Sequence, residues 1–417
     1  MKRLILLSLL LFNLESFSSY ILIPMDETQT NHLKSYGIAF LTLEQDVKVD
    51  WLLNYRGGSF LIKHYPEIEK ECIIRGVSYQ IIADVQSTEI LKSISSPSVN
   101  QDVVRLEKTP KIAIYSPKNK QPWDDAVTMA LSYAEIPYEV IYDDEVLSDI
   151  LPLFDWLHLH HEDFTGQYGK FYASYKNATW YKEQKVLYEQ TATKLGFDKV
   201  SEEKLAVAKK IKNFVMGGGF LFAMCSATDS YDIALASQNT DICAHMFDGD
   251  PIESGAQNKL DFSKTLAFKD FSLVTNPNQY EFSSIDATSN RKIKAEVDFF
   301  TLFDFSAKWD PIPTMLCQNH TRVVKGFMGQ TTSFNNEFIK SDVLIMGETK
   351  STNESRYIHG TLGNGTWTFY GGHDPEDYQH KVGDPKTDLS LHPNSAGYRL
   401  ILNNILFPAA KKKKQKT

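Results

Sequence analysis

Cysteine is scarce in this sequence. The chain has four cysteines among 417 residues, and no two of them stand in a C-x-x-C arrangement. A disulfide scaffold needs a much denser set, so the cysteine content excludes that class and leaves room for one bridge. The core must therefore come from apolar packing, for which 42% hydrophobic and 12% aromatic residues are ample. The four cysteines are Cys72, Cys225, Cys243 and Cys317.

An excess of positive charge is also missing. The formal net charge is −8, and the acidic residues form no block. A nucleic-acid partner needs a basic stripe that neutralises phosphates, so we expect no binding of nucleic acid. The one basic run, Lys411–Lys414, stands at the end of the chain, and we expect residues 411–417 to form a short frayed tail.

Long apolar runs are absent except at the start of the chain. Lys2 and Arg3 precede an apolar stretch over residues 4–12, and small residues follow that stretch. This order is typical of a secretory signal peptide, which we place at residues 1–19. The stretch is too short to cross a bilayer comfortably, and no later run is longer. The sequence therefore predicts an exported protein, periplasmic or secreted, with no stable membrane insertion.

Apolar strands alternate with amphipathic helices along most of the chain. Residues 20–105 predict an N-terminal α/β segment, which ends near the Ser- and Pro-rich stretch SISSPSVNQD at residues 93–102. A second α/β run covers residues 106–410 and contains an irregular insertion over about residues 245–350. Strands separated by helices pair in parallel through right-handed crossovers. We therefore predict an α/β fold built on a doubly wound parallel sheet.

Three loops that follow predicted strands are rich in reactive side chains. HHEDFTG (160–166) follows FDWLHL, CSATDSYD (225–232) follows GFLFAM, and HDPEDYQH (373–380) follows TWTFYGG. Because the carboxyl ends of parallel strands meet at one edge of a sheet, we expect the three loops to lie together there. From these loops we select as candidate substrate-binding residues His160, His161, Glu162, Asp229 and Asp374.

Two parts of the sequence resemble a known family. The first is the run of glycines, strand and loop that leads to CSATD, and the second is GNGTWTFYGGHDPED with the closing helix that ends in LNNILF. They look like the trehalose-utilisation (ThuA-like) branch of the class I glutamine amidotransferase-like superfamily. The resemblance covers residues 109–250 and 355–410, about half of the chain. It implies a flavodoxin-like sheet and a loose link to carbohydrate metabolism.

A narrower resemblance extends over nearly the whole chain after residue 19. YILIPMDETQTNHLKSYGIAF, VDWLLNYRGGSF and GGHDPEDYQHKVGDP look like a family of exported bacterial proteins that often carries the label asparagine synthetase B. A glutamine-dependent synthetase of that name needs a cysteine at its mature N-terminus and an SGG-x-DS loop for ATP. This sequence has neither, so the resemblance carries the label and not the synthetase activity.

The superfamily resemblance implies a catalytic triad. In glutamine amidotransferases a cysteine stands on a strand-to-helix elbow, and a histidine and a glutamate follow a late strand. The matching residues here are Cys225, His373 and Glu376. A thiolate activated by His373, with Glu376 orienting the imidazole, would act as a nucleophile. Two departures from the pattern are the Met and Ser that flank Cys225 and the three-residue spacing from His373 to Glu376.

Two other interpretations remain open from the residues alone. The same loops, with Asp163 added, offer nitrogen and oxygen ligands for a zinc- or calcium-type ion, although no H-E-x-x-H motif occurs and no cofactor is specified. The aromatic residues over 156–181 would suit sugar stacking, or they belong to the core. We therefore predict a hydrolase acting on a small molecule or carbohydrate, or else a catalytically silent carbohydrate- or ligand-binding protein.

Overall fold

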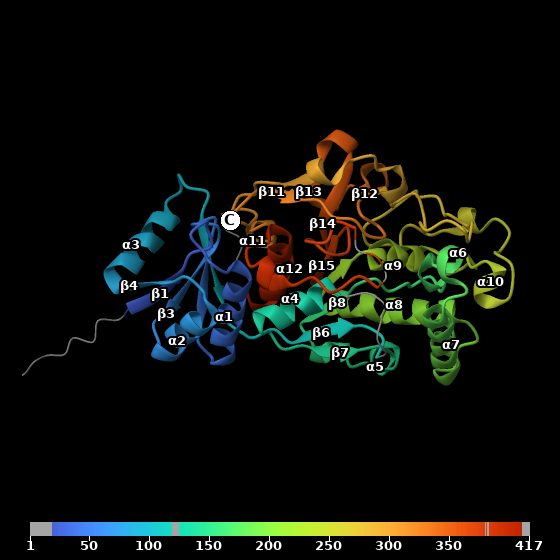
Figure 1. Cartoon of the computed structure of the whole chain (residues 1–417), viewed down its shortest axis with the longest axis horizontal. Helices are drawn as coiled ribbons and strands as arrows, with labels where there is room; N and C mark the ends of the chain where they lie inside the picture. The colour runs from blue at the N-terminus through green and yellow to red at the C-terminus, as the bar shows by residue number, and fades with distance from the viewer. Residues whose placement is uncertain (1–18, 119–124, 380, 382, 411–417) are drawn as a thin grey trace, which may run out of the picture.

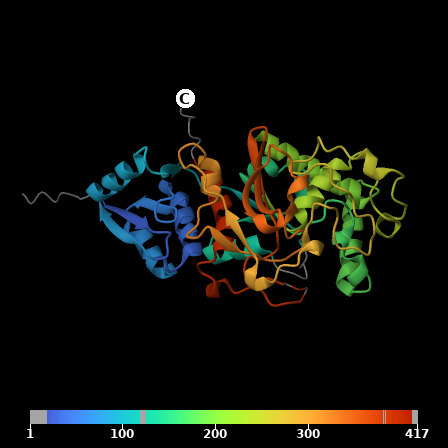
Figure 2. The same cartoon turned by 90° about the horizontal axis from the view of Figure 1, so that it is seen from above.

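The computed structural model describes residues 19–118, 125–379, 381 and 383–410. The chain forms an elongated molecule with the N-terminal sheet at one end and α6, α7 and α10 at the other (Figures 1 and 2). The predicted signal peptide, apart from Ser19, and the predicted basic tail both lie outside the described residues. The helices are α1 (His32–Glu44), α2 (Pro66–Arg75), α3 (Asp84–Ser95), α4 (Ala126–Ala134), α5 (Asp143–Leu147), α6 (Tyr172–Tyr175), α7 (Thr179–Lys194), α8 (Val200–Gly217), α9 (Ser226–Ala236), α10 (His245–Asp248), α11 (Pro311–Leu316) and α12 (Ala396–Leu406).

The N-terminal segment forms a five-stranded sheet in the order β4-β1-β3-β2-β5. All of its neighbouring strands are antiparallel. The strands are β1 (Ser19–Ile23), β2 (Val49–Leu53), β3 (Ser59–Lys63), β4 (Gln80–Ala83) and β5 (Asp102–Leu106).

The prediction of parallel pairing in this segment is wrong. The stretch RGGSF (56–60) leads directly from β2 into β3 with no helix between them, so β2 and β3 form a hairpin. Asn54, Arg56, Gly57 and Gly58 all have positive φ, which lets the chain reverse within a few residues. A Cβ on Gly57 would lie 2.2 Å from the Met25 carbonyl oxygen, so only glycine fits this part of the turn.

The second sheet is mixed. Strands β7, β6, β8, β9 and β15 are parallel to one another, and β15 then pairs antiparallel with β14. The strands are β6 (Ile112–Tyr115), β7 (Glu139–Ile141), β8 (Trp156–Leu159), β9 (Phe220–Met224), β10 (Phe299–Leu302), β11 (Val323–Lys325), β12 (Phe334–Asn335), β13 (Leu344–Thr349), β14 (Glu354–Leu362) and β15 (Gly365–Tyr370).

The predicted insertion over about residues 245–350 contributes strands to this sheet. Strands β10, β11 and β13 continue the sheet beyond β14 in antiparallel pairs. The predicted α/β fold is therefore confirmed in its coarse form, as a large sheet with helices. Only the part of the sheet from β7 to β15 is parallel.

A single apolar core joins the two sheets. Residues of α1 and of the first sheet pack in the same cluster as α4, α12 and one face of the second sheet. Polar bonds fix the same junction, since the buried Arg399 donates from Nη1 to the Met25 carbonyl (2.9 Å) and from Nη2 to the Gly57 carbonyl (2.8 Å). The N-terminal segment is thus a separate sheet with a shared core.

Within the described part of the chain, no helix has both the length and the apolar character needed to cross a membrane.

Candidate functional site

The three reactive loops lie at one edge of the second sheet. Strands β8, β9 and β15 are neighbours, and their registers place Leu159 beside Ala223 and Tyr370 beside Met224. The residues that follow these strand ends, among them His160 and Cys225, therefore leave the sheet at the same edge. The loop contacts agree, because the amide of Ala227 donates to the His160 carbonyl (3.0 Å). The convergence expected from the sequence is present.

Three imidazoles meet at this edge and form what we call the histidine centre: His160, His161 and His373. His160 Nε2 lies 2.8 Å from His373 Nδ1, which is a hydrogen bond between the two rings. The His161 ring centroid is 4.6 Å from that of His160 and 6.0 Å from that of His373. His160 is 2% exposed and His373 is 7% exposed, so the centre is largely shielded from solvent.

The surroundings of His161 favour its neutral form. Burial lowers the pKa of His161 well below its usual value, and the neighbouring His160 and His373 lower that pKa further. In general, the unprotonated nitrogen of a neutral imidazole can accept a proton or bind a metal ion. The geometry thus suits either a general base or a ligand set.

Asp125 lies beside His160, on the side of the ring away from His373. Its Oδ1 accepts from the amides of Val127 (2.7 Å) and Thr128 (2.9 Å), which caps α4. The same carboxylate lies 3.3 Å from His158 Nε2 and 3.9 Å from His160 Nδ1. Burial raises the pKa of Asp125, but the two histidines outweigh burial and hold that pKa well below its usual range. Asp125 is therefore a fixed negative charge beside two imidazoles.

Cys225 stands on a strained turn between β9 and α9. Its φ of 53° and ψ of −142° are rare for a non-glycine residue, and such strain concentrates at functional sites. The thiol is 4% exposed and receives backbone N–H groups from Ser226 and Gln330. Burial nevertheless raises the pKa of Cys225 to about 12. No hydrogen bond joins this thiol to an imidazole among the described residues.

Asp229 lies deeper than the other predicted binding residues. It is fully buried, and its Oδ1 accepts from the Thr331 hydroxyl (2.8 Å) and from the Ser230 amide (3.0 Å). Burial first, and then the nearby Asp286, raise the pKa of Asp229 well above its usual value. Asp229 thus lies near a second buried carboxyl group, that of Asp286, and both carboxyl groups raise the pKa of Cys225.

Asp374 and Glu376 shape the loop after β15. Asp374 Oδ1 accepts from the Tyr398 hydroxyl (2.8 Å) and the Glu376 amide (2.9 Å), and its Oδ2 accepts from the Thr387 hydroxyl (2.6 Å). The Glu376 carboxylate lies 3.3 Å from His392 Nδ1. The structure therefore does not bring Glu376 into hydrogen-bond contact with His373, and the contacts of Asp374 and Glu376 stabilise the loop itself.

Glu162 points away from the histidine centre into a buried cluster around Lys204. Lys204 Nζ donates to Asp143 (2.7 Å), and to the hydroxyls of Tyr115 (2.9 Å) and Tyr142 (3.0 Å). The Tyr142 hydroxyl also lies 3.3 Å from Glu162 Oε2. Burial raises the pKa of Glu162 to about 8, although Lys204 acts in the opposite direction. Glu162 is thus part of a buried charge network.

Glu203 belongs to the same network and makes stability depend on pH. It is 1% exposed, and burial raises its pKa to about 8 against the attraction of Lys204, 4.0 Å away. Because Glu203 has a higher pKa in the folded protein than in the unfolded chain, its protonated form stabilises the fold. This contribution to the free energy of unfolding is present in full below about pH 4.3 and is lost as the pH rises towards 8. We expect Glu203→Gln to gain at least about 1 kcal/mol over wild type between pH 5 and pH 8, measured by urea unfolding. Glu202→Gln, at the exposed neighbouring position, should leave the pH profile unchanged, and the same profile for both variants would contradict the assignment.

A small cavity adjoins His161. Its volume is about 20 Å³, which is room for one water molecule. Asp163 lines it and also accepts from the amides of Thr165 (2.7 Å) and Gly169 (2.9 Å), which fixes the loop that follows β8. The other walls are aromatic or amide side chains, namely Tyr168, Phe171, Trp180, Tyr181, Gln184 and Tyr188.

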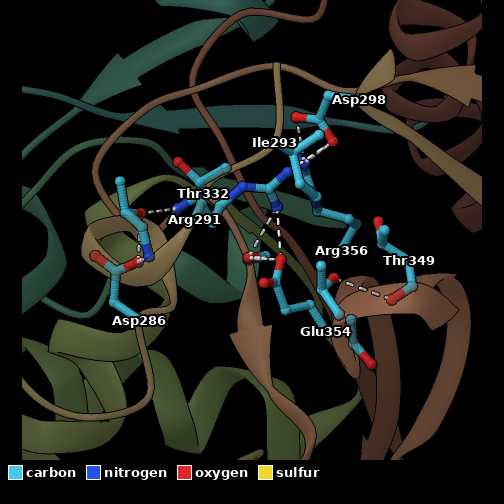
Figure 3. A network of polar contacts seen from close by, with 12 residues as sticks. Asp286, Arg291, Ile293, Asp298, Thr332, Thr349, Glu354 and Arg356 are labelled. Carbon is cyan, nitrogen blue, oxygen red and sulfur yellow. Dashed lines mark hydrogen bonds and ion pairs between the residues drawn. The ribbon is translucent and has the colours of Figure 1, made fainter. Parts of the chain in front are cut away.

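A loop from the insertion, residues 326–333, covers Cys225 and His373. A Cβ on Gly329 would lie 2.7 Å from the His373 amide nitrogen, so the two segments are in close contact. Buried arginines fix both ends of this loop: Arg356 donates to the Phe327 carbonyl (3.0 Å) and Arg291 to the Ser333 hydroxyl (3.2 Å). Figure 3 shows these arginines between Asp298 and Glu354.

Sequence reasoning missed Asp125 and the loop 326–333. Asp125 was available to the same argument as the histidines, because it lies in the loop after β6, a fourth strand at the same edge. No local signal in the irregular insertion places Gln330 beside Cys225, since that contact depends on how the insertion folds back.

Comparison with models of protein families and with curated proteins gave no match. Among solved structures the chain is similar to two cytoplasmic proteins from Salmonella typhimurium. STM3548 is 12% identical with a TM-score of 0.35, covering 73% of this chain and 100% of that one. STM1381 is 11% identical with a TM-score of 0.37, covering 72% and 100%. Gan42B, a GH42 beta-galactosidase from G. stearothermophilus, is 10% identical with a TM-score of 0.26, covering 64% and 28%. The function proposed below rests on the residues of the site.

Proposed function

We propose that this protein is an exported hydrolase that acts on a small molecule or carbohydrate at the histidine centre. The observation that carries the proposal is the hydrogen bond between His160 and His373, with His161 beside it, at the carboxyl edge of parallel strands. Open α/β sheets bind their ligands at that edge. Paired buried imidazoles there suit the movement of a proton to and from a reacting water molecule.

The parallel part of the sheet supports assignment to a flavodoxin-like, ThuA-like architecture. Its strands lie in the order β7-β6-β8-β9-β15, which in chain order is 2-1-3-4-5. The strained turn at Cys225 stands where the amidotransferase-like elbow would be. The antiparallel extension from β14 to β11 is an addition to that architecture.

The reaction that suits this site is attack by water. Water adds to the electrophilic carbon of the bond that is cleaved, an imidazole of the centre takes the proton from that water, and the leaving group takes a proton as it departs. His373 is the residue best placed for this role, because it leaves the sheet beside Cys225 and contacts His160. Glu376 has no part in it, since its carboxylate pairs with His392.

The second candidate is hydrolysis through a Cys225 thiolate. The specific observation in its favour is the positive φ of Cys225 together with the two backbone N–H groups at its sulfur. Against it stands the pKa of about 12, which leaves the thiol protonated at neutral pH. Substrate binding would have to bring an imidazole to the sulfur before this route could operate.

A panel of substrates tests the proposal and separates the two routes. We expect wild-type protein to hydrolyse a member of a panel of glycosides, esters, glutamine and asparagine, and Cys225→Ala to keep its rate within about tenfold. A loss of about 10³-fold or more in Cys225→Ala would replace the water route by the cysteine route. The proposed enzyme would be overturned if folded wild-type protein hydrolysed no member of the panel. Saturable binding of a sugar, measured by calorimetry, would then favour the binding-protein alternative.

A further inference from the structure

We propose that the histidine centre binds one divalent metal ion of the zinc class, with His160, His161 and His373 as its ligands. One ligand nitrogen from each of the three imidazoles lies within 4.8 Å of the others. Tetrahedral zinc with zinc–nitrogen bonds of about 2.0–2.1 Å separates its ligand nitrogens by about 3.3–3.4 Å. The observed limit of 4.8 Å is wider than this spacing, so metal binding would draw the three nitrogens into the tetrahedral arrangement.

The ligand types indicate which ion is bound. Three imidazoles with no thiolate and no carboxylate among them suit zinc and related transition-metal ions, whereas calcium and magnesium prefer oxygen ligands. Three protein ligands with an open fourth position are also the pattern of catalytic rather than structural zinc sites. A cavity of about 20 Å³, which has room for one water molecule, adjoins one of the three ligands, His161.

Asp125 acts as a positioning residue for this site. It lies 3.9 Å from His160 Nδ1, on the opposite side of the ring from the Nε2 that faces His373. A carboxylate in that place fixes the orientation of a ligating imidazole and makes it more basic. Asp125 is itself anchored, because two amides of α4 bond to its Oδ1. The bonds from the two amides thus hold the Asp125 carboxylate near His160 Nδ1.

His158 is excluded from the ligand set by its own contacts. Its Nδ1 lies 3.1 Å from the Phe222 carbonyl, and its Nε2 lies 3.3 Å from Asp125. Both ring nitrogens face oxygen acceptors, so neither offers a lone pair to a cation. The group Asp125, His158 and His160 is therefore a support for the metal site and not a second site.

The other cluster of metal-type side chains already holds a cation. Asp241, Cys243 and Asp248 lie close together, but Lys199 Nζ is 2.5 Å from Asp241 and 3.1 Å from Asp248. The Cys243 thiol donates to the Thr165 carbonyl (3.2 Å). The lysine ammonium balances these acids, so the histidine centre is the candidate that the described residues favour.

The proposal rests on the proposed function only for the role of the metal: with the three imidazoles as its ligands, the metal would lower the pKa of bound water towards about 7 and so replace an imidazole as the means of activating that water. Metal binding itself is measured without a substrate. We expect full-length protein purified without chelator to contain about one equivalent of zinc by elemental analysis. After removal of that zinc with a chelator, the protein should take up one equivalent of Zn²⁺ or Co²⁺, and the Co²⁺ form should give the absorption of tetrahedral cobalt.

Variants assign the ligands. His161→Asn and His373→Asn, each checked for folding by thermal unfolding, should lose the equivalent of Zn²⁺. Asp125→Asn keeps the helix cap and should weaken Zn²⁺ affinity by about 10–100-fold with the stoichiometry unchanged. His64→Asn, at a partly exposed histidine paired with Glu69 (2.7 Å), is the matched control and should bind Zn²⁺ like wild type.

Two results would overturn the proposal. One is folded wild-type protein that takes up no Zn²⁺ or Co²⁺ when either is supplied at twofold excess. The other is unchanged uptake by folded His161→Asn and His373→Asn variants. Failure of the proposed function has a different signature: stoichiometric metal binding to the wild-type centre with no hydrolysis across the substrate panel.

Discussion

Replacing His373 with alanine is expected to lower kcat/KM by about 10³-fold or more on the substrate that the panel identifies. The reason is that His373 contributes to both proposals: its Nδ1 is 2.8 Å from His160 Nε2, and the residue belongs to the proposed ligand set. Loss of one positioned acid–base group costs about 10²–10⁴-fold, and loss of a ligand to the proposed metal would remove the activation of water by that metal instead. Steady-state kinetics of the purified variant measure the effect.

The neighbouring loop supplies the control. Glu376→Gln alters a residue only three positions away, whose carboxylate contacts His392 rather than the histidine centre. We expect this variant to keep kcat/KM within about threefold, since it touches no reacting group. If His373→Ala retained more than a tenth of wild-type activity, or if Glu376→Gln fell as far as His373→Ala, the role given to His373 would have to be abandoned.

Replacing Asp298 with alanine is expected to destabilise the protein by about 3–5 kcal/mol. Asp298 is fully buried and balances two buried guanidinium groups: Arg291 Nη2 is 2.6 Å from its Oδ1, and Arg356 Nη2 is 2.8 Å from both oxygens (Figure 3). Glu354 remains as a partner for Arg291 only, at 2.6 Å. The variant therefore buries a positive charge without a counterion. Urea unfolding measures the loss.

An exposed ion pair provides the comparison for this variant. Asp304 pairs with Arg322, but the two side chains are 48% and 64% exposed. Water screens such a pair, so Asp304→Ala should cost no more than about 1 kcal/mol. Equal losses for Asp298→Ala and Asp304→Ala would show that burial does not make the Asp298 cluster special.

The sequence predicted the second sheet better than the first. Strands such as β8, β9 and β15 are apolar runs with clear boundaries, and their period and flanking glycines are local properties. The hairpin of β2 and β3 was missed because RGGSF reads equally well as a turn between any two elements. Antiparallel neighbours can be joined by a tight reversal of the chain, whereas parallel neighbours need a longer crossover. Here four residues with positive φ allow the tight reversal, so β2 and β3 pair antiparallel.

The candidate site, too, was predictable from the sequence only in part. The edge of the sheet could be predicted because strand direction alone determines where carboxyl ends lie. The partners of each side chain could not, because they depend on loops that fold back from distant parts of the chain. Glu162 turns towards Lys204, and Gln330 reaches Cys225 from the insertion.

By itself, the sequence determined the apolar strands β8, β9 and β15 and the edge at which the reactive loops meet. Those features depend on local periodicity and on strand direction, which neighbouring residues specify. Only the tertiary structure decided that His160, His161 and His373 form one centre, that Asp125 stands behind it, and that Glu376 belongs to His392. These contacts join residues far apart in the chain, and a buried charge or imidazole takes whichever partner the packed loops bring within reach.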